Sequence, residues 1–142
     1  MDLPALLREQ RLLAIVRGRH AESVLETVLV LAREGDVAGF FGPSEPVCKG
    51  ILGALKDASK AGKTKFVGFD GGEELAAGMD QHQIDALVVQ RPVLMGELAV
   101  KAAVAALRHE PIPKVQPIDP LLITQQNKDQ PDVRELLQPR TR

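Results

Sequence analysis

The alternation of short apolar runs with segments of helical periodicity most restricts what this chain can fold into. Five apolar runs recur, at residues 12–16, 37–41, 65–69, 86–90 and 121–124. They are nearly continuous rather than alternating, which is typical of strands covered on both faces. Between them, apolar residues return every three or four positions, as in Val24, Val28 and Ala32, or Val47, Ile51 and Leu55. This order predicts four strand–helix units followed by a last strand.

Such an order predicts an α/β fold with helices on both faces of a parallel sheet. With right-handed crossovers, the interpretation is a three-layer, flavodoxin-like domain whose five parallel strands follow the order 2-1-3-4-5. The 142 residues fit one domain and are too few for a closed barrel of eight strand–helix units. A connector with four prolines at residues 110–120 precedes the last strand, and a short helix is expected at 132–137.

Helix ends have their own residue signals. Ser44 is placed to cap the second helix, and Pro46 suits its first turn. Gly35 and Gly62 stand where the first two helices are expected to stop. The fourth helix is expected from about residue 93 to 108, with Leu94 and Leu98 on its apolar face.

The charge balance and the aromatic content exclude several classes of function. Lys and Arg number 18 against 19 Asp and Glu, so nothing in the charge favours a nucleic-acid or membrane partner. The chain has no Trp and no Tyr, which leaves little material for stacking against bases or sugar rings. No secretory signal is recognisable, so the chain as written is expected in the cytoplasm.

Polar residues follow the predicted strands directly, at the edge of an α/β sheet where ligands bind. These candidate ligand-binding residues are Arg17, Ser44, Glu45, Asp70, Gln90 and Arg91. Each has a simpler alternative role as a helix cap, a first-turn residue or a solvent-facing charge.

No catalytic residue, metal ligand or cofactor is expected. Cys48 falls within the predicted second helix, where packing explains it. His20, His82 and His109 are dispersed and lack metal-ligand spacing. Gly71 and Gly72 do not belong to a dinucleotide-binding fingerprint, because the required glycine spacing is absent.

From about residue 36 to 142 the chain resembles the C-terminal lobe of type I periplasmic sugar-binding proteins, the ribose- and galactose-binding kind. The resemblance rests on the runs Gly68-Phe69-Asp70-Gly71, Ile84-Asp85-Ala86-Leu87-Val88-Val89-Gln90 and Met95-Gly96-Glu97-Leu98-Ala99-Val100. In that family an Asn or Asp after one strand, an Asp in the Gly-Phe-Asp run and a later Gln hold sugar hydroxyls. Asp70 and Gln90 match the last two. Ser44, followed by Glu45, stands in place of the Asn and offers a shorter side chain.

The first 35 residues resemble a different family, the 2-keto-3-deoxy-6-phosphogluconate aldolases. Here the resemblance rests on Leu12-Leu13-Ala14-Ile15-Val16-Arg17-Gly18 and Leu31-Ala32-Arg33-Glu34-Gly35. Arg17 matches the substrate-side arginine of that family, whose catalytic Glu and Schiff-base Lys fall in parts without a counterpart here. The two resemblances favour a chimera, engineered or natural, with segments 1–35, 36–127 and a tail at 128–142.

Three functions follow as hypotheses. The first is a single lobe without efficient activity that binds sugar at most weakly. The second is a functional sugar-binding module using Ser44, Asp70 and Gln90, and the third is an aldolase relic using Arg17. A substituted or missing strand–helix unit leaves an edge or an apolar patch exposed, which favours a homodimer.

Overall fold

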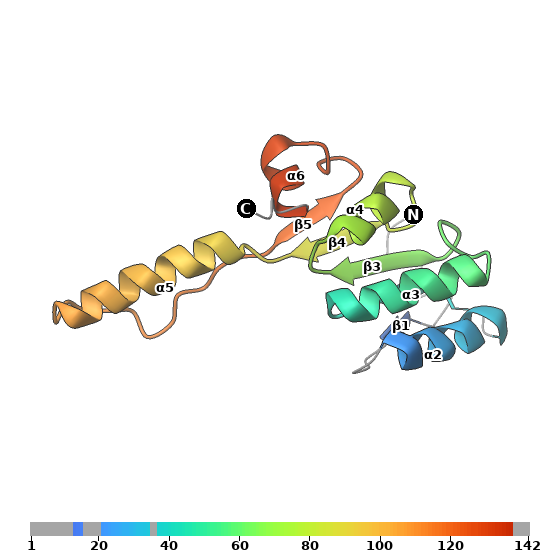
Figure 1. Cartoon of the computed structure of the whole chain (residues 1–142), viewed down its shortest axis with the longest axis horizontal. Helices are drawn as coiled ribbons and strands as arrows, with labels where there is room; N and C mark the ends of the chain where they lie inside the picture. Colours follow the sequence, from blue (N-terminus) through green and yellow to red (C-terminus); the bar gives the residue numbers. More distant parts are fainter. Residues whose placement is uncertain (1–12, 16–20, 35–36, 138–142) are drawn as a thin grey trace. The chain divides into compact units, whose positions relative to one another are not determined.

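The computed structural model describes residues 13–15, 21–34 and 37–137, and Figure 1 shows the whole chain. The elements are β1 (Leu13–Ile15), α2 (Ala21–Glu34), β2 (Gly39–Phe41), α3 (Glu45–Asp57), β3 (Lys65–Phe69), α4 (Glu73–Asp80), β4 (Ala86–Val89), α5 (Pro92–Leu107), β5 (Leu121–Thr124) and α6 (Pro131–Leu137). The predicted succession of strands and helices is confirmed.

The chain divides into two compact units. One comprises the residues up to 89 and those from 122 onward, and the other comprises residues 90–121. The first unit holds the sheet with α2, α3, α4 and α6, and the second holds α5 and the proline-rich connector. The predicted single domain with segment boundaries after residues 35 and 127 stays a prediction.

The strands lie in the order β1-β2-β3-β4-β5, so the predicted order 2-1-3-4-5 was wrong. β1, β2, β3 and β4 pair in parallel, with Ile15 opposite Phe41 and Phe41 opposite Val67. The arrow of β5 points against those of β3 and β4 in Figure 1, so the sheet is mixed rather than wholly parallel. β5 is reached through the separate unit 90–121, so no strand–helix–strand crossover within the sheet imposes a parallel direction on it.

The strand order also decides on which face the helices lie. When parallel strands are added one after another in the same direction, right-handed crossovers put all their helices on one face. Accordingly α2 packs along α3, and α3 contacts α4 (Figure 1). The predicted three layers required these helices to divide between both faces, so that expectation was wrong for α2, α3 and α4.

The core lies between this helix layer and the sheet. Phe40, Phe66 and Leu87 point from the strands into it, each with no more than 1% of its surface exposed. The apolar stripes predicted for the first two helices are confirmed, because Val24, Val28, Ala32, Val47, Ile51 and Leu55 are buried. Leu75 and Met79 of α4 are buried as well.

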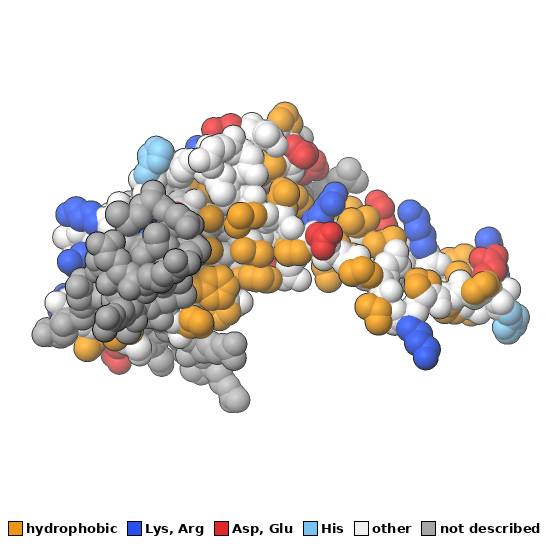
Figure 2. Space-filling model, turned by 180° about the vertical axis from the view of Figure 1, so that it is seen from behind, with side chains coloured by type: hydrophobic (Ala, Val, Ile, Leu, Met, Phe, Trp, Pro, Cys, Tyr) orange, Lys and Arg blue, Asp and Glu red, His pale blue; other side chains and the backbone are white. Residues whose placement is uncertain are grey.

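The other face of the sheet is also apolar, and we call it the second face. It comprises Ile15, Phe41, Val67, Phe69, Val88 and Leu122. Along the strands these residues alternate with core residues. On neighbouring strands, Ile15 lies opposite Phe41, Phe41 opposite Val67, and Phe69 opposite Val88. Four of these are half-buried, while Ile15 is 60% and Leu122 is 55% exposed. Figure 2, seen from behind, shows hydrophobic side chains gathered over the sheet.

Cys48 fixes how closely α3 approaches the sheet. Its Sγ lies 3.4 Å from the carbonyl oxygen of Gly42 and accepts the N–H of Phe69 at 3.3 Å. A Cβ at Gly42 would lie only 2.6 Å from this sulfur, and one at Gly68 only 2.9 Å. Burial raises the pKa of the Cys48 thiol, although hydrogen bonding to Phe69 opposes the effect. The predicted packing role of Cys48 is confirmed.

The ends of α3 differ in two details from the prediction. Ser44 is the N-cap residue and Pro46 lies in the first turn, but the Ser44 side chain makes no capping hydrogen bond. The helix ends at Asp57, so Gly62 does not stop it; Gly62 instead takes a positive φ of 74° in the following turn. Gly35, predicted to stop the preceding helix, lies outside the described residues.

The second unit consists of α5 and the connector that follows it. In Figure 1 the chain turns after α5 and runs back beside the helix. No residue of α5 is buried, and Leu94 and Leu98, predicted on its apolar face, are half-buried. Among the described residues, no helix is long and apolar enough to span a membrane.

Candidate functional site

The carboxyl ends of β2 and β3 bring three of the predicted residues to one edge of the sheet. Ser44 and Glu45 follow β2 at the start of α3, and Asp70 follows β3 directly. The two loops are adjacent, because Oε1 of Glu45 lies 2.8 Å from the position that a Cβ on Gly72 would take. This edge is where ligands bind in open α/β sheets.

Asp70 is held in an uncommon backbone conformation. Its φ is +68°, in the left-handed region that few residues other than glycine adopt, although aspartate tolerates it better than most. Its N–H donates to the carbonyl oxygen of Val88 at 2.9 Å, which continues the pairing of β3 with β4 by one residue. The half-buried Asp70 is therefore fixed at the strand end by its backbone.

The glycines after Asp70 let α6 pack against this turn. A Cβ on Gly71 would lie 3.2 Å from the carbonyl oxygen of Leu136, and the N–H of Gly72 donates to the carbonyl of Leu137 at 3.0 Å. Gly72 also has a φ of 143°, which a side chain disfavours. The turn that presents Asp70 is thus supported by the C-terminal helix.

Glu45 and Ser44 have different surroundings although they are neighbours. The Glu45 carboxylate pairs with Lys49 at 2.8 Å, one turn along α3, and this hydrogen bond raises the pKa of Lys49. The Ser44 side chain takes no part in capping the helix. A hydroxyl and a carboxylate therefore stand beside Asp70 at this edge.

The other three predicted residues do not belong to this group. Gln90 and Arg91 follow β4 at once, are exposed, and are the first residues of the second unit, where Arg91 is the N-cap residue of α5. Arg17 lies outside the described residues. Among those described, no group of three or more His, Cys, Asp or Glu residues is arranged to hold a metal ion.

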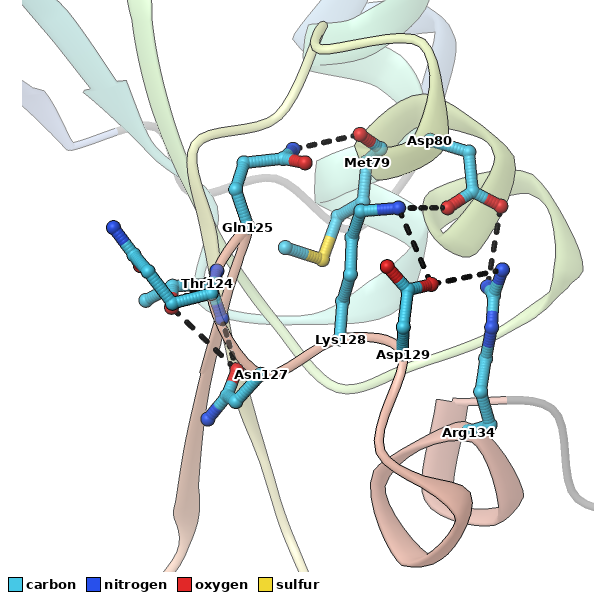
Figure 3. Close-up of polar contacts among 9 residues, drawn as sticks. Met79, Asp80, Thr124, Gln125, Asn127, Lys128, Asp129 and Arg134 are labelled. Carbon is cyan, nitrogen blue, oxygen red and sulfur yellow. Dashed lines mark hydrogen bonds and ion pairs between the residues drawn. The ribbon is translucent and has the colours of Figure 1, made fainter.

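A second polar cluster, which the sequence reasoning missed, joins α4 to the C-terminal segment (Figure 3). Asp80 at the end of α4 accepts hydrogen bonds from Lys128 Nζ at 2.7 Å and from Arg134 Nη1 at 3.1 Å. Asp129 lies 3.5 Å from both cations. The hydrogen bond from Lys128, and after it the contact with Arg134, lower the pKa of Asp80. The charged residues of this segment are visible in the sequence, but Asp80, the partner of Lys128, lies 48 residues away in α4.

The backbone around this cluster is tied down as well. Gln125 Nε2 donates to the carbonyl of Met79 at 2.7 Å, and Asn127 Oδ1 accepts the N–H of Thr124 at 2.7 Å (Figure 3). Because each carboxylate of the cluster already faces cations of this chain, we interpret it as a structural fastening of β5 and α6, not as a ligand site.

Comparison with known proteins shows the family. Residues 18–111, well over half of the chain, match the periplasmic binding protein domain, and the chain belongs to that family. It is 32% identical over 96 residues to the ribose import binding protein RbsB of Haemophilus influenzae, covering 68% of this chain and 32% of that protein. It is 28% identical to the D-allose-binding periplasmic protein of Escherichia coli, covering 33% of that protein.

Solved structures agree on the fold. A solute-binding protein from Agrobacterium vitis with bound D-fucose superposes with a TM-score of 0.75 at 34% identity, over 83% of this chain and 41% of that one. Another from the same organism, bound with α-D-tagatopyranose, gives a TM-score of 0.78 at 25% identity, over 85% of this chain and 41% of that one. The fold is therefore an α/β lobe of the periplasmic-binding-protein kind, and the chain spans about a third of the length of its curated relatives.

The family also bears on the other expectations. Its members are solute-binding proteins rather than enzymes, which agrees with the expected lack of enzymatic activity. The match begins at residue 18, inside the segment 1–35 that resembles an aldolase, so neither the aldolase segment nor a chimera gains support. The family is periplasmic, as the resemblance implied, and the expected cytoplasmic location of the chain as written stays a prediction.

Proposed function

We propose that this chain is a single sugar-recognition lobe that binds a small monosaccharide weakly at the carboxyl edge of its sheet. The observation that carries the proposal is Asp70, held at φ +68° beside Ser44 and Glu45, within a family region whose relatives are named for ribose and D-allose. Gln90, Arg91 and Arg17 follow neighbouring strands in the sequence and complete the proposed set.

The residue types at this edge suit a sugar. Carboxylates accept hydrogen bonds from sugar hydroxyls, and the Ser44 hydroxyl and an amide such as Gln90 both donate and accept. A neutral sugar is bound by such a mixture of donors and acceptors rather than by one strong charge. A set that combines Ser44, Glu45, Asp70 and Gln90 supplies both.

The expected affinity is low. Each solvent-exposed hydrogen bond contributes about 1 kcal/mol net, so three or four of them give a dissociation constant of roughly 1 mM or weaker. The chain has no Trp or Tyr with which to add a stacking platform against the sugar ring. The single lobe thus leaves one side of the sugar in water.

The test is an NMR titration of the labelled chain with D-ribose, D-allose, D-fucose and D-arabinose up to about 50 mM, well above the expected dissociation constant. We expect saturable shifts at Ser44, Asp70 and their neighbours for at least one sugar. Asp70→Ala should weaken that binding at least about tenfold, because it removes a charged acceptor.

Asp57→Ala is the matched control. Asp57 is an exposed aspartate at the far end of α3, on the opposite edge of the sheet from Ser44. It should leave the shifts unchanged. If no sugar produces saturable shifts at this edge, or if both variants weaken binding equally, the proposed site is wrong.

A further inference from the structure

The end of helix α6 lies directly against the turn that presents Asp70. The N–H of Gly72 donates to the carbonyl oxygen of Leu137 at 3.0 Å. A Cβ added at Gly71 would lie 3.2 Å from the carbonyl oxygen of Leu136 and 3.3 Å from the Cα of Leu137. A backbone hydrogen bond and a close approach of backbones therefore join a helix and a turn that are far apart in the sequence.

The turn takes backbone conformations that need such support. Asp70 has a φ of +68°, and Gly72 has a φ of 143°. Uncommon conformations of this kind persist where the surrounding structure fixes them. The bond from the Asp70 N–H to the carbonyl of Val88 fixes the beginning of the turn, and the bond from Gly72 to Leu137 fixes its end.

The position of Gly72 also matters for the second carboxylate at this edge. Oε1 of Glu45 lies 2.8 Å, and its Cδ 3.3 Å, from the place that a Cβ on Gly72 would take. The Glu45 carboxylate therefore occupies space that the glycine leaves free. A shift of Gly72 changes how Asp70 and Glu45 lie relative to each other.

Tertiary contacts alone keep α6 in place. It has only seven residues, too few for a helix that is stable by itself. The side chain of Leu137 is fully buried, and that of Val133, one turn earlier, is 1% exposed. Arg134, between them, pairs with Asp80 at the end of α4 at 3.1 Å (Figure 3). Leu137 is thus both an apolar anchor of α6 and the residue whose carbonyl holds the turn.

We propose that Leu137 is a positioning residue for the sugar edge. Its buried side chain anchors α6, and its carbonyl oxygen then holds Gly72 so that Asp70 and Glu45 keep the arrangement that binds sugar. The inference rests on the proposed function, and Leu137 acts through Gly72 without touching the sugar. When α6 leaves its place, the apparent affinity falls in proportion to the fraction of chains that keep the turn in order.

Leu137→Ala tests the proposal, because it removes the anchor and leaves the backbone carbonyl. In the full chain without sugar, the amide of Gly72 should exchange hydrogen at least about tenfold faster. In NMR titrations with D-ribose, D-allose, D-fucose and D-arabinose, the dissociation constant of any sugar that binds should rise about three- to tenfold. Circular dichroism checks that the variant is folded.

Leu55→Ala is the matched control. Leu55 is an equally buried leucine near the end of α3, on the opposite edge of the sheet from Ser44. Its truncation leaves a cavity in the core and destabilises the lobe without touching α6. As long as the chain stays folded, the dissociation constant for sugar should be unchanged.

A milder pair of variants decides the matter if Leu137→Ala does not fold. Arg134→Gln weakens the ion pair of α6 with Asp80 and should speed exchange at Gly72 about threefold. Arg134→Lys keeps the cation and should largely restore the wild-type rate. Lys128→Gln is the control, because Lys128 pairs with the same carboxylate from the loop after β5, and it should leave Gly72 unchanged.

The outcomes separate this inference from the proposed function. Wild-type exchange at Gly72 in Leu137→Ala, or in Arg134→Gln if the first variant does not fold, contradicts the inference. Faster exchange with an unchanged dissociation constant for sugar contradicts it as well. A wild-type chain that binds no sugar overturns the proposed function instead, and exchange at Gly72 then decides alone whether Leu137 positions the turn.

Discussion

At the scale of single residues, small side chains decide how closely the elements approach. Cys48 fits under the sheet only because Gly42 and Gly68 have no Cβ to meet its sulfur.

The Asp85 side chain joins two neighbouring strands. Its carboxylate accepts the N–H of Phe66 at 2.9 Å and pairs with Lys65. This Asp85 contact holds the beginnings of β3 and β4 together.

We expect Gly42→Ala to lower the free energy of unfolding by about 1–3 kcal/mol, because its methyl group would overlap the Cys48 sulfur. Urea denaturation measures the change. The double variant with Cys48→Ala should lose less free energy of unfolding than the sum of the losses of the two single variants, by at least about 0.5 kcal/mol.

Gly53→Ala is the control for this prediction. A Cβ at Gly53 would meet only Leu25 Cδ1, at an ordinary distance of 3.6 Å. Because alanine favours helix more than glycine, this variant should gain about 0.5–1 kcal/mol. Equal losses at Gly42 and Gly53 would refute the role assigned to the sulfur contact.

At the scale of elements, an ion cluster fastens the C-terminal segment to α4. Lys128 and Arg134 meet Asp80 from the loop after β5 and from α6, and α6 in turn supports the glycine turn that presents Asp70. The ion cluster is thus linked through α6 to the edge of the sheet at which we propose that sugar binds.

Asp80→Asn should lower the melting temperature by about 1–3 °C at pH 7 and low salt, since exposed ion pairs contribute at most about 1 kcal/mol. The pKa of Asp80 is lowered in the folded state, so its contribution is present above about pH 4 and is lost as the pH falls through that lowered pKa. Melting curves of the variant and the wild type should therefore converge at strongly acidic pH.

The exposed Asp57 again provides the comparison, because Asp57→Asn should not lower the melting temperature. If the difference between Asp80→Asn and the wild type stayed constant down to pH 2, the ion pairs would not be its cause. High salt should also shrink that difference, because it screens the ion pairs, whereas acid removes them by protonating Asp80.

At the scale of the whole molecule, the two units differ in how their helices are stabilised. Helix α3 buries seven residues, whereas α5 buries none. An isolated helix of sixteen residues is only marginally stable in water, so packing decides how often it opens.

Hydrogen exchange of the full chain should give amides of α5 protection factors at least about tenfold smaller than those of α3, because α3 buries seven residues and α5 buries none. Equal protection of both helices would contradict this expectation.

Much of the fold could be predicted from local patterns, because periodicity reports burial of each element. The stripes at Val24, Val28 and Ile51 and the short helix near residue 132 were predicted and are present. The order of the strands was not, because β1 pairs with β2 through contacts that no local pattern encodes. The candidate site was predicted as a set of strand-end residues, and the described structure brings Ser44, Glu45 and Asp70 to one edge.

The sequence by itself determined the α/β class, the elements and which residues follow each strand, since hydrophobic periodicity and turn residues act over a few positions. Only the tertiary structure decided the strand order, the single layer of α2, α3 and α4, the direction of β5 and the fastening of Asp80 by Lys128 and Arg134. Those features depend on contacts between residues distant in the chain, and their free energies are set by packing and geometry rather than by local preference.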